Sequence, residues 1–167
     1  MQALAIIFLC IVSAILYGIL HDQVTARVCV EYFTIGHPPI FGTDDPTLLG
    51  IGWGIIATWW VGLLLGIPLA IVARAGRRSK REVRDLIWPL TILLMVMAAC
   101  ALTAGVLGWV LAENGIVFLV GHVAREVPAE KHVPFIADLW AHSASYIVGV
   151  VGGVVLMVQV WRSRTVP

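Results

Sequence analysis

Four long apolar stretches constrain the fold of this 167-residue chain more than any other feature. They cover about residues 3–20, 48–73, 86–111 and 135–161, and none carries a charged side chain near its centre. A helix needs roughly 20 mainly apolar residues to cross the hydrocarbon core of a bilayer. Backbone groups cannot stay unpaired in lipid, so we expect these segments to be helices. The sequence predicts an all-α integral membrane four-helix bundle, one transmembrane domain over residues 1–167.

Composition excludes several other classes of protein. Hydrophobic residues make up 60% of the chain and charged residues 13%, whereas soluble domains have about 45–50% and ~25%. This balance argues against a soluble globule, a disordered chain or a nucleic-acid-binding protein. The first span has no basic segment before it and no convincing cleavage site before Tyr17. We therefore expect a retained helix rather than a cleaved signal peptide.

The basic residues are distributed very unevenly along the chain. Eight of the eleven follow the second or the fourth span: Arg74, Arg77, Arg78, Lys80, Arg81, Arg84, Arg162 and Arg164. The positive-inside rule places this loop, this tail and hence both termini in the cytoplasm. Two structured loops, residues 21–47 and 112–134, then lie outside. With the start of the fourth span, this outer half holds eight acids and three bases, a formal charge of −5.

All five histidines also fall in the outer half, although membrane topology alone does not require it. Imidazole and carboxylate ligands together suit Zn²⁺, Fe²⁺ or Mn²⁺. The sequence therefore predicts an outward-facing transition-metal site. Its candidate ligands are His21, His37, His132, His142 and Asp138, with Glu31 and Glu126 as further candidates.

The start of the fourth span carries the strongest single signal for a site. Asp138, His142 and Tyr146 follow one another at intervals of four residues, so they share one stripe of a helix. Ionisable side chains at membrane depth are costly and usually face the bundle interior or a water-filled cavity. A structural interpretation stays open, because Asp138 in a first helical turn is also favoured by the helix dipole.

The first outer loop extends the first span directly. A helix continuing to about Phe33 would place His21, Thr25, Cys29 and Tyr32 near one face. It would also allow an ion pair between Arg27 and Glu31, which lie four residues apart. Alternatively, His21 and Asp22 simply form hydrogen bonds at the end of the first helix.

Several shorter patterns predict local structure. Asp45 can cap the second span, and Pro46 suits its first helical position. Gly62-x-x-x-Gly66 and Gly149-x-x-x-Gly153 allow close approach of helices. A helix over residues 116–126 would place His122 and Glu126 on one face, lying flat on the membrane. Three scattered cysteines give no disulfide framework.

Part of the sequence resembles a group of membrane proteins, and this resemblance implies no activity. Residues 17–38, the segment GTDDPT at 42–47, and Trp53 with Trp59 and Trp60 resemble uncharacterised bacterial four-span inner-membrane proteins. The resemblance covers roughly the first half of the chain. It implies a bacterial four-helix inner-membrane protein, for which the orientation given by the positive-inside rule places the polar site on the periplasmic side.

Two functions remain open at this point. The first is a membrane metalloprotein, which as an enzyme would use a metal-bound water with Glu31 or Glu126 as general base. Arg27 and Arg125 would then hold an anionic substrate. The second is a non-enzymatic scaffold or accessory subunit whose polar cluster is purely structural. Such a subunit would associate with a membrane protein partner or with further copies of itself.

Overall fold

The computed structural model describes residues 1–165 and is all-α over that range. The helices are α1 (Gln2–Val28), α2 (Val30–Thr34), α3 (Pro46–Ile56), α4 (Trp59–Arg74), α5 (Val83–Glu113), α6 (Val123–Glu126) and α7 (His132–Arg162), with a 3-10 turn at Ala129–Lys131. Four segments are long and apolar enough to cross a membrane: Gln2–Val28, Pro46–Arg74, Val83–Glu113 and Ala129–Arg162. The predicted helical class and the four predicted spans are confirmed at this level.

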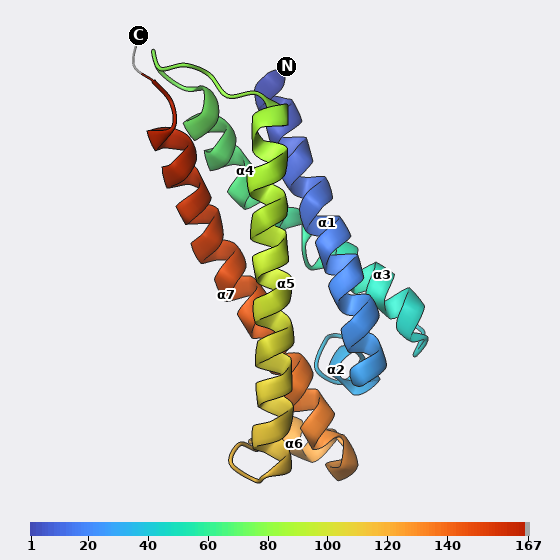
Figure 1. Ribbon diagram of the computed structural model, residues 1–167. Helices are drawn as coiled ribbons and strands as arrows, with labels where there is room; N and C mark the ends of the chain where they lie inside the picture. Colours follow the sequence, from blue (N-terminus) through green and yellow to red (C-terminus); the bar gives the residue numbers. More distant parts are fainter. Residues whose placement is uncertain (166–167) are drawn as a thin grey trace.

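The helices form two closely packed groups. α1 packs along α3 and α4, and α5 packs along α7, while the two groups meet less extensively, mainly where α4 lies beside α7. The start of α1, the end of α7 and the α4–α5 connection lie together at one end of the molecule (Figure 1). We name this the arginine end, after residues 74–84 and Arg164. The opposite end, with α2 and α6, is the histidine end.

The second apolar stretch is not one continuous helix, as the sequence predicted, but two. Its start is as expected, because Asp45 Oδ1 accepts hydrogen bonds at 2.9 Å from the backbone N–H groups of Thr47 and Leu48. The helix then breaks between Ile56 and Trp59. There the Thr58 hydroxyl donates to the Gly54 carbonyl, and such side-chain bonds compete with the helical backbone ladder. Pro68 lies inside α4 without ending it.

Glycines bring α4 and α1 into close contact. A Cβ atom at Gly62 would lie 2.7 Å from the Cys10 carbonyl oxygen, and one at Gly66 would lie 3.0 Å from Cys10 Cβ. The predicted close approach at this glycine pair is confirmed. Gly149 and Gly153 of α7 instead face the side chains of Met97 and Leu65.

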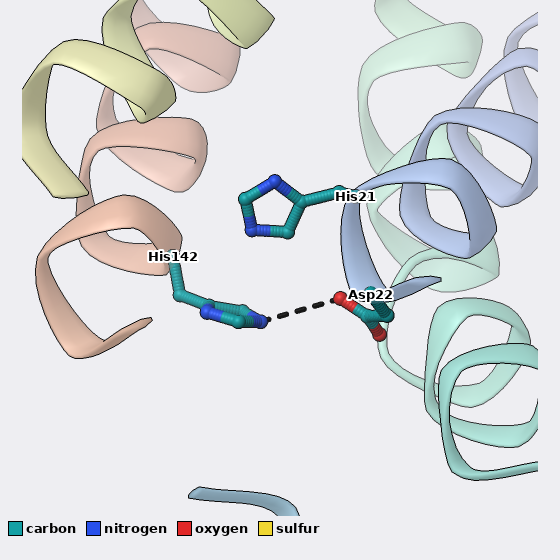
Figure 2. Close-up of side chains that lie close together, drawn as sticks. All are labelled: His21, Asp22 and His142. Atoms are coloured by element: carbon teal, nitrogen blue, oxygen red, sulfur yellow. Dashed lines mark hydrogen bonds and ion pairs between the residues drawn. The ribbon is translucent and has the colours of Figure 1, made fainter. Parts of the chain in front are cut away.

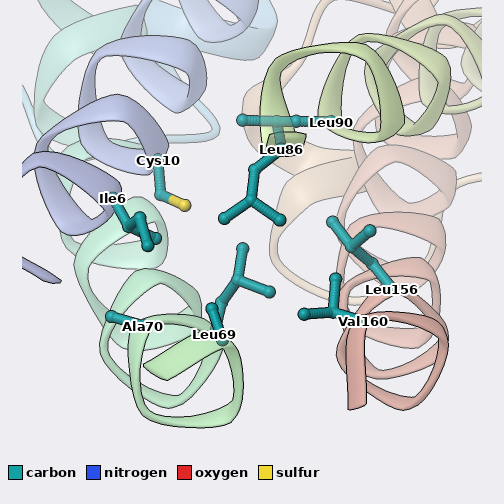
Figure 3. Close-up of a cluster of buried hydrophobic side chains, with 9 residues drawn as sticks. Ile6, Cys10, Leu69, Ala70, Leu86, Leu90, Leu156 and Val160 are labelled. Atoms are coloured by element: carbon teal, nitrogen blue, oxygen red, sulfur yellow. The ribbon is translucent and has the colours of Figure 1, made fainter. Parts of the chain in front are cut away.

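An apolar core fills the half of the bundle towards the arginine end. It draws side chains from all four spans (Figure 3): Ile6 and Cys10 of α1; Leu69, Ala70 and Ala73 of α4; Leu86 and Leu90 of α5; Leu156 and Val160 of α7. Close-packed aliphatic side chains hold the helices in fixed register here. Polar side chains gather in the other half.

One arginine after α7 fastens the chain to the α4–α5 connection. Arg164 is only 1% exposed, and its guanidinium donates to four backbone carbonyls: Val72, Ala75, Arg78 and Ser79. Val72 and Ala75 lie at the end of α4, where carbonyls lack intrahelical partners. From the sequence alone, Arg164 indicates only the topology of the chain in the membrane.

Two predictions about the loops at the histidine end are wrong. Only Val123–Glu126 of the expected helix over residues 116–126 is helical. Gly115 and Gly121 flank the rest with positive φ angles of 69°, which suit a glycine turn rather than a helix. The expected Arg27–Glu31 ion pair is also absent from the described residues. Arg27 donates to Gln23 and Thr47, and Glu31 pairs with Lys131 at 3.1 Å.

The helix extending from the first span ends earlier than expected. Cys29 adopts an extended backbone conformation, with φ −149° and ψ 96°, and separates α1 from α2. The expected inward face nevertheless exists, because Thr25, Cys29 and Tyr32 are all buried. The break turns α2 so that Tyr32 and Phe33 cover the polar side chains described below.

Candidate metal centre

Three ionisable side chains meet between α1 and α7 in the half of the bundle towards the histidine end. His21 and Asp22 come from α1 and His142 comes from α7, and all three point into the same space (Figure 2). One potential ligand atom from each lies within 4.8 Å of the other two. Asp22 is 5% exposed and His142 is 8% exposed. All three lie within segments apolar enough to cross a membrane, where ionisable groups are costly and usually functional.

Hydrogen bonding determines where the proton of His142 lies. Its Nδ1 is 2.8 Å from the backbone carbonyl of Asp138. A carbonyl can only accept, so Nδ1 carries the hydrogen and donates it. In a neutral imidazole, Nε2 then presents a lone pair, and it faces Asp22 Oδ1 at 3.2 Å. A lone pair and a carboxylate oxygen at this distance require a cation between them, either a proton or a metal ion.

His21 adds a second imidazole without a partner of its own. Its Nε2 is buried and accepts or donates no hydrogen bond within residues 1–165. The ring meets His142 edge-on, with centroids 4.5 Å apart, and stacks parallel to Tyr17 at 5.8 Å. An unsatisfied buried polar atom costs about 1–3 kcal/mol. Binding a cation beside His142 would relieve this cost.

Aromatic side chains surround the group and fix the imidazole rings. Tyr32 stacks on His142 with centroids 4.4 Å apart, and Phe33 meets the same ring at 5.7 Å. The Tyr17 hydroxyl and the Ser145 hydroxyl are joined by a 2.8 Å hydrogen bond that links α1 to α7. This wall limits access of water and lowers the local dielectric, which strengthens electrostatic interactions within the group.

Asp138 is a second buried acid beside this group. It is 1% exposed, and its Oδ2 has no hydrogen-bond partner in the described part of the chain. It lies one helical turn before His142 and close enough to Asp22 for their charges to interact. The sequence prediction that Asp138 and His142 face the interior is confirmed. Tyr146, on the same stripe, is partly exposed.

Cys29 is a packed thiol rather than a ligand. Burial raises the pKa of this thiol to about 12, and the nearby charges of Asp138 and Glu31 act in the same direction. Its Sγ donates to Glu31 Oε2 at 3.4 Å. Cys29 does not belong to the group of potential ligand atoms formed by His21, Asp22 and His142.

Of the other predicted ligands, His37 lies beside the group and His132 lies apart from it. His37 Nδ1 donates to the Tyr32 carbonyl at 2.8 Å, and its ring packs on Trp53. Burial lowers the pKa of His37, which favours the neutral imidazole. His132 Nε2 instead bonds the Val127 carbonyl at 3.0 Å. Neither belongs to the group of three.

The predicted catalytic and substrate-binding residues are not brought to this group. Glu31 is held by Lys131, and Glu126 faces the exposed His122 at 3.7 Å. Arg27 is engaged with Gln23 and Thr47, and Arg125 is exposed on α6. These four residues surround the histidine end but do not line the space between α1 and α7.

Asp22 is the member of the group that the sequence analysis left out of its ligand set. The signal that could have found it is the one applied to Asp138, an ionisable residue at membrane depth. Asp22 follows the first apolar stretch directly, and α1 continues six residues beyond it, to Val28. A helix that continues past an acid places that acid on a helix face instead of at a helix end.

The donor set is one that transition metals use. Two histidines and one carboxylate hold zinc or non-haem iron while leaving coordination positions free. Donors bound at about 2.1 Å to one ion lie no more than roughly 4.2 Å apart, so a bound ion would draw the widest pair slightly together. Comparison with family models, curated proteins and solved structures finds no match for this chain.

Proposed function

We propose that this chain is an inner-membrane metalloprotein that binds one divalent transition-metal ion through His21, Asp22 and His142. The observation that carries the proposal is the His142 Nε2–Asp22 Oδ1 pair, which is buried, 3.2 Å apart and in need of a cation. The unpartnered nitrogen of His21 beside this pair supplies a third ligand. Zn²⁺, Fe²⁺ and Mn²⁺ all accept this donor set.

The charge distribution supports an orientation for this protein in a bacterial inner membrane. The arginine end carries eight of the eleven basic residues, so the positive-inside rule places it in the cytoplasm. The centre then lies within the bilayer towards the periplasmic face.

A metal ion held by three protein ligands keeps coordination positions free for a substrate or a water molecule. A metal with free positions can polarise a substrate oxygen or lower the pKa of a bound water. Asp138 replaces Glu31 and Glu126 as our candidate for the acid–base group. It is buried beside Asp22 with a free oxygen, whereas Glu31 is paired with Lys131 and Glu126 faces His122. Such an enzyme would act on a substrate that reaches the centre within the membrane.

Metal analysis of the purified protein tests the proposal. We expect detergent-purified wild-type protein to carry close to one zinc, iron or manganese ion per chain, measured by inductively coupled plasma mass spectrometry. His21→Ala, Asp22→Asn and His142→Ala should each lose it. The exposed His122 provides the matched control, and His122→Ala should keep the ion. A wild type that is free of metal and takes none up on dialysis would overturn the proposal and favour a structural role in a scaffold or accessory subunit.

A further inference from the structure

A cavity of about 130 Å³ extends between the two helix groups and includes the polar group at one end. Its lining changes along its length. Towards the histidine end it is lined by Tyr17, His21, Asp22, His142 and Ser145. Towards the arginine end its walls are the aliphatic side chains of Leu69, Leu90 and Leu156, which belong to the apolar core in Figure 3.

The cavity is long and slender. Along α7 its lining extends from His142 to Met157, which is about 22 Å at 1.5 Å per residue. Its volume of 130 Å³ is close to that of a cavity that holds one benzene ring, so a longer apolar chain enters as flexible lining side chains such as Met97 and Met157 move aside. Small residues line the cavity between these two ends, among them Ser13, Ala14 and Gly149.

Tyr146 indicates where the cavity reaches the surface. This residue lines the cavity and is 39% exposed. Its hydroxyl donates to the Ala57 carbonyl at 3.3 Å, at the break between α3 and α4. The surface between α7 and this break would face acyl chains in a bilayer. A ligand dissolved in the membrane would enter from this side when the hydrogen bond between Tyr146 and Ala57 opens.

We propose that this cavity binds a lipid-soluble molecule with one oxygen-bearing head group and one apolar chain. The head lies against His21, Asp22 and His142, and the chain extends towards Leu69 and Leu156. Such a molecule would satisfy the unpartnered Nε2 of His21 at one end and fill apolar space at the other. Long-chain fatty acids and quinones with an apolar tail share this chemistry. Contact between the ligand's head group and a metal ion rests on the proposed function. The position of the ligand's apolar chain does not.

Variants that fill the middle of the cavity test the position of the chain. Ser13→Leu adds bulk from α1, and Gly149→Leu adds bulk from α7, where a Cβ atom would lie 3.1 Å from the flexible end of Met97. Val150→Leu is the matched control, because Val150 lies on α7 with its side chain exposed and outside the cavity lining. The probes are dodecanoic acid and a decyl-substituted benzoquinone, and native mass spectrometry measures their stoichiometry on detergent-purified protein.

We expect one probe molecule per wild-type chain and at least a tenfold loss of occupancy in both cavity variants, with the control unchanged. Metal content and thermal unfolding confirm that the variants are folded. Preference for the acid or for the quinone identifies the head group. Absence of a stoichiometric complex, or binding that both cavity variants leave unchanged, overturns the proposal.

A parallel measurement on chelated protein separates this proposal from the metal centre. If the probes bind but no metal does, the proposal of a lipid-ligand cavity is supported and the metalloprotein proposal is wrong. If the metal binds and neither probe does, the metal centre stands and the lipid-ligand proposal fails.

Discussion

The two ends of the molecule bury charged groups in opposite ways. At the arginine end, the guanidinium of Arg164 is fully buried and donates to four backbone carbonyls. Towards the histidine end, His21 Nε2 and Asp138 Oδ2 are buried without any partner in residues 1–165. Asp22 and the Nε2 lone pair of His142 face each other and share a need for a cation. At the arginine end, the protein itself supplies the hydrogen-bond partners of the buried group. Towards the histidine end, the buried polar atoms find partners only when a ligand or ion binds.

The difference arises from what the backbone can supply. The end of a helix offers carbonyls without intrahelical partners, and these match the donors of an arginine. Towards the histidine end, the Cys29 backbone is the one hydrogen-bond partner of the Asp138 carboxyl in the described part of the chain, and Asp138 Oδ2 and His21 Nε2 have none. A buried polar group whose hydrogen-bond partners all come from its own chain stabilises the packing of that chain. One that its own chain leaves unsatisfied is suited to a ligand.

Arg164→Ala should give the largest effect on stability. The substitution leaves the carbonyls of Val72, Ala75 and Ser79 without their hydrogen bonds from Arg164. The free energy of unfolding should therefore fall by about 2–4 kcal/mol. Chemical unfolding in mixed micelles measures this loss. Metal content of the folded fraction should not change. Arg162→Ala, at an exposed neighbour, should lower the free energy of unfolding by no more than about 0.5 kcal/mol. Equal losses in the two variants would contradict a stabilising role for the buried hydrogen bonds of Arg164.

Metal binding should stabilise the protein through the histidine end. At a free ion concentration of 100 Kd, the free energy of unfolding should rise by about 2.7 kcal/mol. The unfolding temperature, measured with and without a chelator, gives the shift. Asp22→Asn should abolish the shift because it removes the carboxylate that faces His142. A shift that persists in this variant would place the ion elsewhere.

The same variant should have the reverse effect on chelated protein. Without a metal ion, Asp22 and Nε2 of His142 avoid facing each other as two acceptors only by taking up a proton between them. In Asp22→Asn the new amide can donate to Nε2 of His142, so we expect the free energy of unfolding to rise by about 1 kcal/mol. Unfolding of chelated wild type and variant in parallel provides the measurement. A less stable variant would show that the wild-type pair is already satisfied by a proton.

Alkylation of Cys29 should give the smallest signal. With its pKa raised to about 12, the thiolate fraction at pH 8 is about 10⁻⁴, and the residue is buried. Maleimide labelling followed by peptide mass spectrometry should leave Cys29 unmodified until the protein is denatured. Chelation should not change this result if the centre is formed by packing. Labelling that appears only after chelation would show that the ion holds α2 in place.

Helical patterning made much of the fold predictable. The four spans follow from apolar length, the cap at Asp45 from its position before Pro46, and a close helix approach, though not its partner α1, from the Gly62 and Gly66 spacing. The breaks at Cys29 and at Ala57–Thr58 were not predictable in this way. Neither contains glycine or proline, and each depends on what packs around it. The turn at Gly121 could have been foreseen from residue type alone.

The site was predictable only in part, for a related reason. Asp138 and His142 stand out because they interrupt an apolar stretch. Asp22 lies at the edge of such a stretch, and its importance emerges only when α1 continues past it and α7 supplies His142 opposite. Contacts across 120 positions of sequence leave no local signal. The Arg164 contacts with the α4–α5 connection are hidden for the same reason.

The break between α3 and α4 bears on the hydration of the bundle. Non-helical backbone at membrane depth is tolerated only where protein covers it or where it lines a wet cavity. Ala57 and Thr58 line the same cavity as Asp22 and His142, at its polar end. The backbone N–H and carbonyl groups of Ala57 and Thr58 are already paired within the protein, and the Ala57 carbonyl accepts from the Tyr146 hydroxyl of α7. The break therefore needs no water to exist within a span, and α7 supplies part of what the interrupted helix has lost.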